Sequence, residues 1–330
     1  MKNTSFNLLI KHKLFMKSHN LLKLPQQELD SKKVFGFEAN FQITSLKDKH
    51  NFVPSIDSHY CFDKDSTNAI LAAFMFNKKT ILTGLHGSGK STHIEQVAAR
   101  LNWPCIRINL DGQISRADML GRDTITIQDG KQVTEFQEGL LIYALRNPVA
   151  LILDEYDAGK ADIMFVLQRI LEQEGKLTLL ETNEVIEPHS HFRIFATCNT
   201  LGSGDEYGIY HGTSFINQGQ LDRWDQIIQL DYLSEKNEIK LLKEKFKKDK
   251  KVSIDLIKNA VSIANLIRYG FKEEELSCVI STRTLISFIE SYINYDSLPY
   301  AFKVSIYNRF NKEEQETLSE LFQKVFAIEL

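Results

Sequence analysis

Residues 84–91 limit what this chain can fold into more than any other stretch does. They read GLHGSGKS and match the phosphate-binding pattern G-x-x-x-x-G-K-[ST] at every required position. Glycines let a backbone curl closely around a polyphosphate and direct its N–H groups inward. Lys90 can reach the β- and γ-phosphates, and the hydroxyl of Ser91 can bind Mg²⁺. The pattern therefore predicts a nucleotide site.

The flanking sequence supplies the setting that this motif requires. Thr80–Thr83 is a short apolar run typical of a strand, and Thr92–Leu101 carries apolar residues at helical spacing. A strand, a glycine-rich loop and a helix place the phosphates at a helix N-terminus, where the dipole favours negative charge. The alternative, a glycine turn that arises by chance, does not account for this setting.

Composition narrows the class of protein. The chain has 330 residues, 43% of them hydrophobic and 25% charged, which is ordinary for one large or two modest globular domains. A net charge of −3 gives no electrostatic reason to expect a nucleic-acid partner, and no apolar stretch is long enough to span a membrane. The four cysteines are scattered, which favours a reducing compartment such as the cytoplasm over a disulfide framework. His189 and His191 have a spacing seen in metal sites, but they lack a nearby Cys and a structural role is the simpler interpretation.

Strand and helix patterns alternate until about residue 233, after which helical patterns continue to the C-terminus. Val149–Leu153 is an uninterrupted apolar run, as expected of a parallel strand that is buried on both faces. Arg122–Phe136 and Lys176–Ile186 are typical of β-hairpins, the first because of its Asp-Gly turn. We therefore predict an α/β fold with a parallel five-stranded sheet, two inserted hairpins and a C-terminal domain of helices alone.

Four segments are expected along the chain. Residues 1–30 would be a basic, flexible extension, with a targeting segment or a start codon assigned too early as alternatives to a native extension. Residues 31–65 contain short β-type runs such as Val34–Phe37 and would form a small N-terminal segment. Residues 66–233 would form the nucleotide-binding α/β domain, and residues 234–330 the helical domain.

Two acidic residues directly follow the run Val149–Leu153. Asp154 would hold the Mg²⁺ shell, usually through water, and Glu155 would polarise the water that attacks the γ-phosphate. The alternative is a pair of solvated acids at a strand end. The phosphate-binding motif upstream favours the catalytic interpretation.

Three further polar residues are candidates because of their order in the chain. Asn199 ends the next predicted strand and could lie beside the two acids, where it would position the attacking water; alone, such an Asn is a turn residue. Arg223 and Arg283 could stabilise the charge that develops on the transferring phosphoryl group, although most surface arginines do not.

The order of these residues is similar to that in AAA+ ATPases, and the two inserted hairpins resemble those of the MoxR and chelatase branch. From about residue 34 to residue 330, longer stretches resemble one family of that branch, the ATPase subunits of aerobic cobaltochelatases. Those stretches are His86–Cys105, Asp129–Phe136, Asp154–Gly159, Tyr210–Thr213 and Ile216–Gln220. Residues 1–30 lie outside the resemblance.

The resemblance implies a role for each candidate residue. Lys90 and Ser91 would form the Walker A pair, Asp154 and Glu155 the Walker B pair, Asn199 sensor 1, Arg223 the finger that reaches the ATP of a neighbouring subunit, and Arg283 sensor 2. The residues in contact with nucleotide would be Gly84, His86, Gly87, Ser88, Gly89, Lys90, Ser91 and Thr92, with Ser91 and Asp154 serving Mg²⁺.

The resemblance also implies an activity and partners. Such proteins use ATP and Mg²⁺, assemble into rings that are usually hexamers, and work with a subunit that carries a von Willebrand-type metal-dependent adhesion domain. In a cobaltochelatase a separate large subunit holds the tetrapyrrole, and ATP hydrolysis would drive insertion of Co²⁺ into hydrogenobyrinic acid a,c-diamide. The alternative is a MoxR-like remodelling ATPase that acts on another von Willebrand-domain partner outside cobalamin synthesis. Neither interpretation assigns cobalt ligands to this chain.

Two positions depart from the family pattern. Thr282 stands where proline is expected before Arg283, and Cys198 stands where alanine is commoner before Asn199. Neither change removes a functional group, so ATPase chemistry is still expected.

Overall fold

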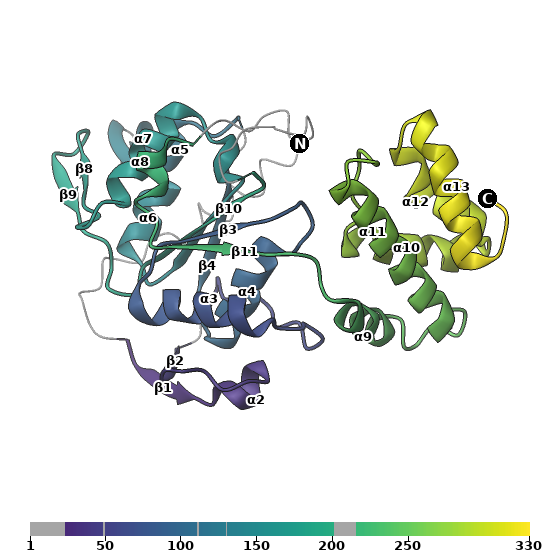
Figure 1. Cartoon of the computed structure of the whole chain (residues 1–330). Coiled ribbons are helices and arrows are strands. Elements are labelled where there is room, and N and C mark those ends of the chain that lie inside the picture. Colours follow the sequence, from purple (N-terminus) through teal and green to yellow (C-terminus); the bar gives the residue numbers. More distant parts are fainter. Residues whose placement is uncertain (1–23, 49, 111, 130, 201–215) are drawn as a thin grey trace.

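The computed structural model describes residues 24–48, 50–110, 112–129, 131–200 and 216–330. Its centre is a sheet of five parallel strands, as predicted (Figure 1). In spatial order the strands are β11 (Gln226–Gln229), β3 (Thr80–Thr83), β10 (Arg193–Cys198), β7 (Ala150–Asp154) and β4 (Cys105–Asn109). The strand β10 therefore lies between β3, which precedes the phosphate loop, and β7, which ends in the first acid.

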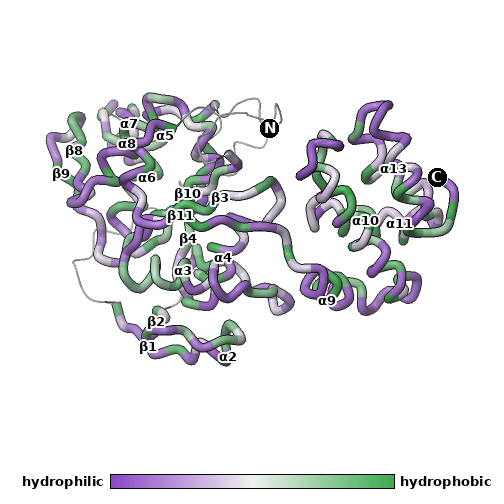
Figure 2. The backbone as a smooth tube through the Cα atoms, viewed as in Figure 1, coloured by the Kyte–Doolittle hydropathy of each residue, from purple (hydrophilic) through white to green (hydrophobic). Residues whose placement is uncertain are grey.

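Every residue of β7 and β10 is buried, which explains their continuous apolar sequence. Alternate residues of β7 face opposite sides, so that Leu151 and Leu153 enter one core while Ala150 and Ile152 enter the other. The helices on the first side are α5 (Arg116–Leu120), α6 (Leu140–Arg146) and α7 (Ala161–Ile170), and those on the second are α3 (Lys64–Phe76) and α4 (Lys90–Arg100). Figure 2 shows the apolar positions gathered along the central strands.

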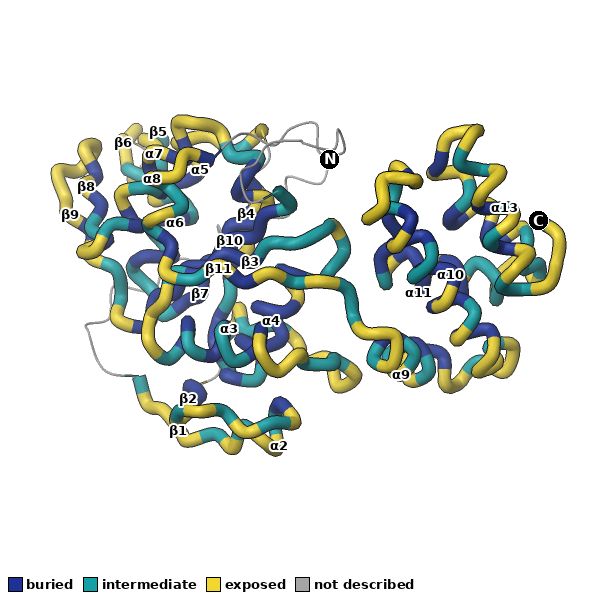
Figure 3. The backbone as a smooth tube through the Cα atoms, viewed as in Figure 1, coloured by how far each residue is buried: buried dark blue, intermediate teal, exposed yellow. Residues whose placement is uncertain are grey.

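Both predicted hairpins are confirmed. One consists of β5 (Gly121–Gln128) and β6 (Lys131–Glu138), and the other of β8 (Leu177–Leu179) and β9 (Glu184–Ile186). Asp129 and Asn183 adopt left-handed backbone angles at the two turns, with φ of 51° and 52°, a conformation that Asp and Asn tolerate better than most residues. The first hairpin is largely exposed, as Figure 3 shows.

The N-terminal part differs from the expectation in two ways. The strand β1 (Gln26–Leu29) pairs antiparallel with β2 (Ile43–Leu46), so the boundary expected at residue 30 is wrong for the last residues of that segment. Residues 1–23 lie outside the described part. The predicted β-type run Val34–Phe37 begins inside a helix, α2 (Ser31–Phe35), because Asp30 caps its start and Gly36 its end.

The C-terminal helices form their own hydrophobic core. They are α9 (Glu235–Lys245), α10 (Ile254–Lys272), α11 (Thr282–Tyr295), α12 (Leu298–Ser305) and α13 (Lys312–Phe326), with a short 3₁₀ turn, η2 (Tyr307–Arg309), before the last. Figure 1 shows this domain joined to the sheet by the chain that leaves β11 and enters α9. Within the described ranges, no helix combines the length and the apolar character that crossing a membrane requires.

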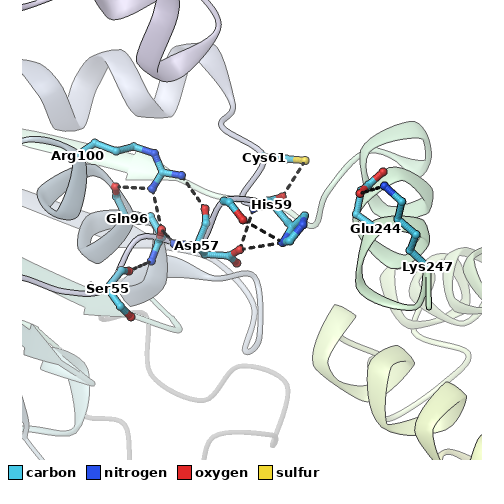
Figure 4. A network of polar contacts seen from close by, with 9 residues as sticks. Ser55, Asp57, His59, Cys61, Gln96, Arg100, Glu244 and Lys247 are labelled. Atoms are coloured by element: carbon cyan, nitrogen blue, oxygen red, sulfur yellow. Dashed lines mark hydrogen bonds and ion pairs between the residues drawn. The ribbon is translucent and has the colours of Figure 1, made fainter. Parts of the chain in front are cut away.

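Polar contacts fasten the segment before α3 to α4 (Figure 4). Gln96 accepts a hydrogen bond from the Asp57 N–H at 2.9 Å and donates to the Ser55 carbonyl at 3.0 Å. Arg100 donates to the Asp57 carbonyl at 2.7 Å, and its guanidinium lies 4.5 Å from the centre of the Phe62 ring. These contacts hold the segment against the helix that follows the phosphate loop.

His93 lies inside this junction and is only 4% exposed. Its ring nitrogens form hydrogen bonds with the hydroxyls of Tyr60 at 2.7 Å and Thr67 at 3.1 Å. Burial lowers the pKa of His93 from 6.5 to about 4. The unfolded chain takes up a proton on this histidine near pH 6.5, whereas the folded ring stays neutral at that pH. The contribution of the neutral ring to the free energy of unfolding is therefore complete above pH 6.5 and is lost as the pH falls through 4.

We expect the substitution His93→Gln to flatten the acid dependence of stability. Between pH 7 and pH 4 the wild type should lose about 3 kcal/mol more free energy of unfolding than the variant, which is the value of this pKa shift. Urea unfolding at the two pH values measures the difference. Burial also lowers the pKa of His191 to about 4. Its contribution to the pH dependence is the same in both proteins and therefore cancels in the comparison. Equal losses in the two proteins would contradict the expectation.

Candidate functional site

The carboxyl ends of three adjacent strands bring the predicted residues to one edge of the sheet. The phosphate loop follows β3, Asn199 follows β10, and Asp154 ends β7. Lys90 donates a hydrogen bond to the Asn199 side chain at 2.9 Å, and Ser91 donates to the Asp154 carboxylate at 2.6 Å. Ligands of open parallel sheets bind at this edge.

The phosphate loop has the geometry that an anion site requires. Gly87 and Gly89 have backbone φ angles of 73° and 88°, which residues other than glycine rarely adopt. Gly89 is also the N-cap of α4 and has no side chain to occupy the first N–H groups of that helix. The Ser88 hydroxyl is buried and finds no hydrogen-bond partner among the residues that the structure describes. The loop therefore fits a polyphosphate.

Lys90 is 9% exposed and points back into the loop. Its ammonium group donates to the carbonyls of Gly84 at 2.7 Å and Leu85 at 3.1 Å. Burial lowers the pKa of Lys90 to about 8, although nearby carboxylates act in the opposite direction. A phosphate group bound in the loop would supply the close negative charge that this lysine lacks.

Asp154 is held by four hydrogen bonds. One oxygen accepts from Ser91 and Thr197, and the other accepts two from the Arg107 guanidinium, the first of them at 2.9 Å. Burial alone would raise the pKa of Asp154, but the bonds from Ser91, Thr197 and Arg107 outweigh it and keep the pKa below its ordinary value. The carboxylate is therefore ionised and oriented, and beside the Ser91 hydroxyl it offers the oxygen ligands that Mg²⁺ prefers.

Sequence reasoning did not identify Arg107. This residue lies in the edge strand β4, where the register places it opposite Ile152, two residues before Asp154. Its position in a strand that alternates between apolar and polar residues was the available signal, but its partner is 47 residues away.

Glu155 lies at the start of the short 3₁₀ turn η1 (Tyr156–Ala158) and has left-handed backbone angles, φ 56° and ψ 46°. Such angles cost a non-glycine residue free energy, and they are common at functional sites. The Glu155 N–H donates to the Thr197 hydroxyl at 3.3 Å, and its side chain is exposed. The carboxylate is therefore free to face solvent beside Asp154.

Asp157 is a second residue that sequence reasoning missed. It is 1% exposed, and one carboxylate oxygen accepts hydrogen bonds from the Asn199 N–H at 2.9 Å and the Thr200 N–H at 3.0 Å. It therefore fixes the turn in which Asn199 lies. The neighbouring Cys198 is buried, and this burial raises the pKa of its thiol, so the departure from alanine adds no charge.

Arg223 does not lie at this edge. It follows the short helix α8 (Gln218–Leu221) in a turn. Its guanidinium pairs with Glu172 at 2.8 Å. The next acid, Asp225, accepts a hydrogen bond from the Lys79 N–H at 2.8 Å, which places this segment at the amino ends of β11 and β3.

Arg283 is exposed in the first turn of α11, close to the phosphate loop. Partial burial lowers the pKa of His86, and the positive charges of Lys90, Arg309 and Arg283 lower it further. Contact between the domains is direct at Gly87, where an added Cβ atom would lie 2.4 Å from that of Ser281. The helical domain thus presents Arg283, and also the unpredicted Arg309, toward the loop.

The interpretation of His189 and His191 as structural is consistent with their contacts. His191 forms a hydrogen bond with the Gln26 side chain at 2.7 Å, and its ring packs at a tilt against that of Trp103. Over the described ranges, no group of three or more His, Cys, Asp or Glu side chains is placed to hold a metal ion.

The chain is similar to several known proteins. Residues 79–208 match the family model of the AAA domain (dynein-related subfamily). The chain is 44% identical over 314 residues to the aerobic cobaltochelatase subunit CobS of Sinorhizobium sp., covering 94% of each protein. It is also 34% identical over 178 residues to midasin of Dictyostelium discoideum, covering 53% of this chain and 3% of midasin. Among solved structures, the Hsp104–casein complex of S. cerevisiae matches with 19% identity and a TM-score of 0.46, over 68% of this chain and 41% of that one.

The similarity to CobS extends over nearly the whole of both chains. The chain therefore contains an AAA ATPase domain and belongs to the family of the aerobic cobaltochelatase subunit CobS.

Proposed function

We propose that this chain is the ATP-hydrolysing subunit of a cobaltochelatase, in which it drives the insertion of Co²⁺ into hydrogenobyrinic acid a,c-diamide. The observation that carries the proposal is 44% identity to CobS along 94% of both chains, combined with a phosphate loop and acids that meet at one sheet edge. Co²⁺ and the tetrapyrrole would be held by a separate large subunit.

The chain's own residues would divide the ATPase chemistry as follows. Lys90 and the first N–H groups of α4 would bind the phosphates. Ser91 and Asp154 would hold Mg²⁺, which when bound neutralises charge on the phosphate oxygens. Glu155 would accept a proton from the attacking water, and Asn199 would orient that water.

The proposal also includes a ring of identical subunits, a hexamer by the family resemblance stated above, and a partner with a von Willebrand-type domain. The position of Arg223 supports an assembly, because that residue lies at the opposite end of β3 from its own phosphate loop. A neighbouring subunit would bring its Arg223 to the site.

Reconstitution tests the proposal. The purified chain, its von Willebrand-domain subunit and the tetrapyrrole-binding subunit would be combined with Co²⁺, MgATP and hydrogenobyrinic acid a,c-diamide. We expect phosphate release and formation of the cobalt corrinoid, detected by its absorption spectrum, with both lost when this chain is omitted. Phosphate release without cobalt insertion would instead favour a remodelling ATPase that acts on another partner. Absence of phosphate release from the complete mixture would refute the proposal.

A further inference from the structure

A buried ion pair lies in the C-terminal helical domain. Glu238 on α9 and Arg268 on α10 are 0% and 6% exposed, and two hydrogen bonds of 2.7 and 2.8 Å join them. Arg268 also donates to the Ile280 carbonyl at 2.7 Å. These bonds connect α9, α10 and the segment before α11. The pair should stay formed, because separating the partners would leave an uncompensated buried charge.

The same pair reaches α11 through Thr282. The Thr282 hydroxyl donates to Glu238 at 2.6 Å, and Thr282 directly precedes Arg283. Proline, the residue expected at this position from the family pattern, could not make this bond. The hydroxyl therefore gives the departure a physical role, which is to fix the first turn of α11 to the ion pair.

On its other side, the ion pair is connected to the phosphate loop by Tyr232, which lies between β11 and α9. The Arg268 guanidinium lies 4.3 Å from the centre of the Tyr232 ring, and the Tyr232 hydroxyl donates to the His86 carbonyl at 2.8 Å. The contacts thus run without interruption from the loop at His86 to Thr282, one residue before Arg283.

We propose that Tyr232 is a positioning residue that transmits the state of the phosphate loop to Arg283 through Arg268, Glu238 and Thr282. The inference rests on the proposed function, since it assumes that nucleotide binds the loop. Gly87 lies against Ser281 at a second point where the loop and the helical domain meet, so a shift of the loop there would press on the start of α11. Tyr232 then determines that the buried pair and α11 move together.

The substitution Tyr232→Phe separates this role from a structural one. It keeps the ring on Arg268 and removes only the hydroxyl that bonds the His86 carbonyl. A matched control is Tyr269→Phe, which removes the hydroxyl of a tyrosine that is 62% exposed on the same helix as Arg268. Thr282→Val should act like Tyr232→Phe, and Thr282→Ser should restore the wild-type behaviour because it restores the hydroxyl.

Hydrogen–deuterium exchange of residues 280–290, with and without a non-hydrolysable ATP analogue, measures the transmission directly. We expect the analogue to slow exchange in the wild type and in Tyr269→Phe. In Tyr232→Phe this slowing should be at most half as large. Analogue affinity should stay within about threefold, while kcat should fall about three- to tenfold, the range that one lost hydrogen bond produces.

The outcomes separate the two proposals. A wild type that fails to bind the analogue refutes both the nucleotide site and the transmission. A wild type that binds it and hydrolyses ATP, together with a Tyr232→Phe variant indistinguishable from Tyr269→Phe, refutes the role of Tyr232 alone. Loss of protection in Tyr232→Phe with unchanged thermal stability supports it.

Discussion

Replacing Arg223 by alanine should lower ATP turnover by about a thousandfold while ATP affinity changes little. A guanidinium near the γ-phosphate acts mainly on the charge that develops during transfer, so its loss affects kcat more than binding. Phosphate release and binding of a fluorescent nucleotide, measured on the same preparation, distinguish the two effects. Arg223→Lys should recover only part of the rate, because lysine keeps the charge without the planar fork of donors.

We propose that this effect comes from the Arg223 of a neighbouring subunit. Arg223 lies near the amino end of β3, and the phosphate loop follows its carboxyl end. The four residues of β3 separate the two ends by about 13 Å. In the single chain the guanidinium pairs with Glu172, which is partly exposed, so the pair is weak enough to open at a subunit contact.

A mixing experiment tests this directly. Subunits with Arg223→Ala keep an intact phosphate site, and subunits with Glu155→Gln keep an intact Arg223. In mixed rings the second kind would supply the missing arginine to the first, and activity should rise above that of either variant alone. If mixing restores nothing although mixed rings form, Arg223 does not act across the interface.

The substitution Glu155→Gln should reduce ATP hydrolysis by about a hundredfold or more and leave nucleotide binding intact. Glutamine keeps the size of the side chain but cannot accept the proton of the attacking water. Because the variant still binds ATP without consuming it, assembled rings should be easier to isolate. Single-turnover phosphate release and equilibrium nucleotide binding are the measurements.

Asp162→Asn is a suitable control for Glu155→Gln. Asp162 is exposed in the first turn of α7, so its variant also removes one negative charge from the segment that follows β7. It should retain wild-type turnover. Full turnover by Glu155→Gln would show that another group is the base.

The sequence was sufficient to predict the parts of the site that depend on short segments. The phosphate loop, the acids after an apolar run and the hairpin turns each follow from a local pattern with a physical cause. The five-stranded parallel sheet and the helical C-terminal domain could also be predicted, because buried parallel strands and helical periodicity leave different patterns.

The supporting contacts could not be predicted in this way. Arg107 reaches Asp154, and Asp157 reaches Asn199, across 47 and 42 residues of chain. Each pair depends on which strands are neighbours in the sheet and leaves no periodic signal in the sequence. The run Val34–Phe37 was misread for a different reason: its β-branched and aromatic residues favour a strand, but the caps at Asp30 and Gly36 enforce a helix.

The four hydrogen bonds on Asp154 bear on the order in which Mg²⁺ and ATP bind to the site. Both carboxylate oxygens are already satisfied by Ser91, Thr197 and Arg107, and the guanidinium cancels the charge that would attract a cation. A divalent ion that binds without ATP would have to break these hydrogen bonds and would gain few favourable contacts to offset their loss. Magnesium should therefore enter together with ATP, whose phosphates supply the missing ligands, and cellular Mg²⁺ by itself should leave the protein unchanged.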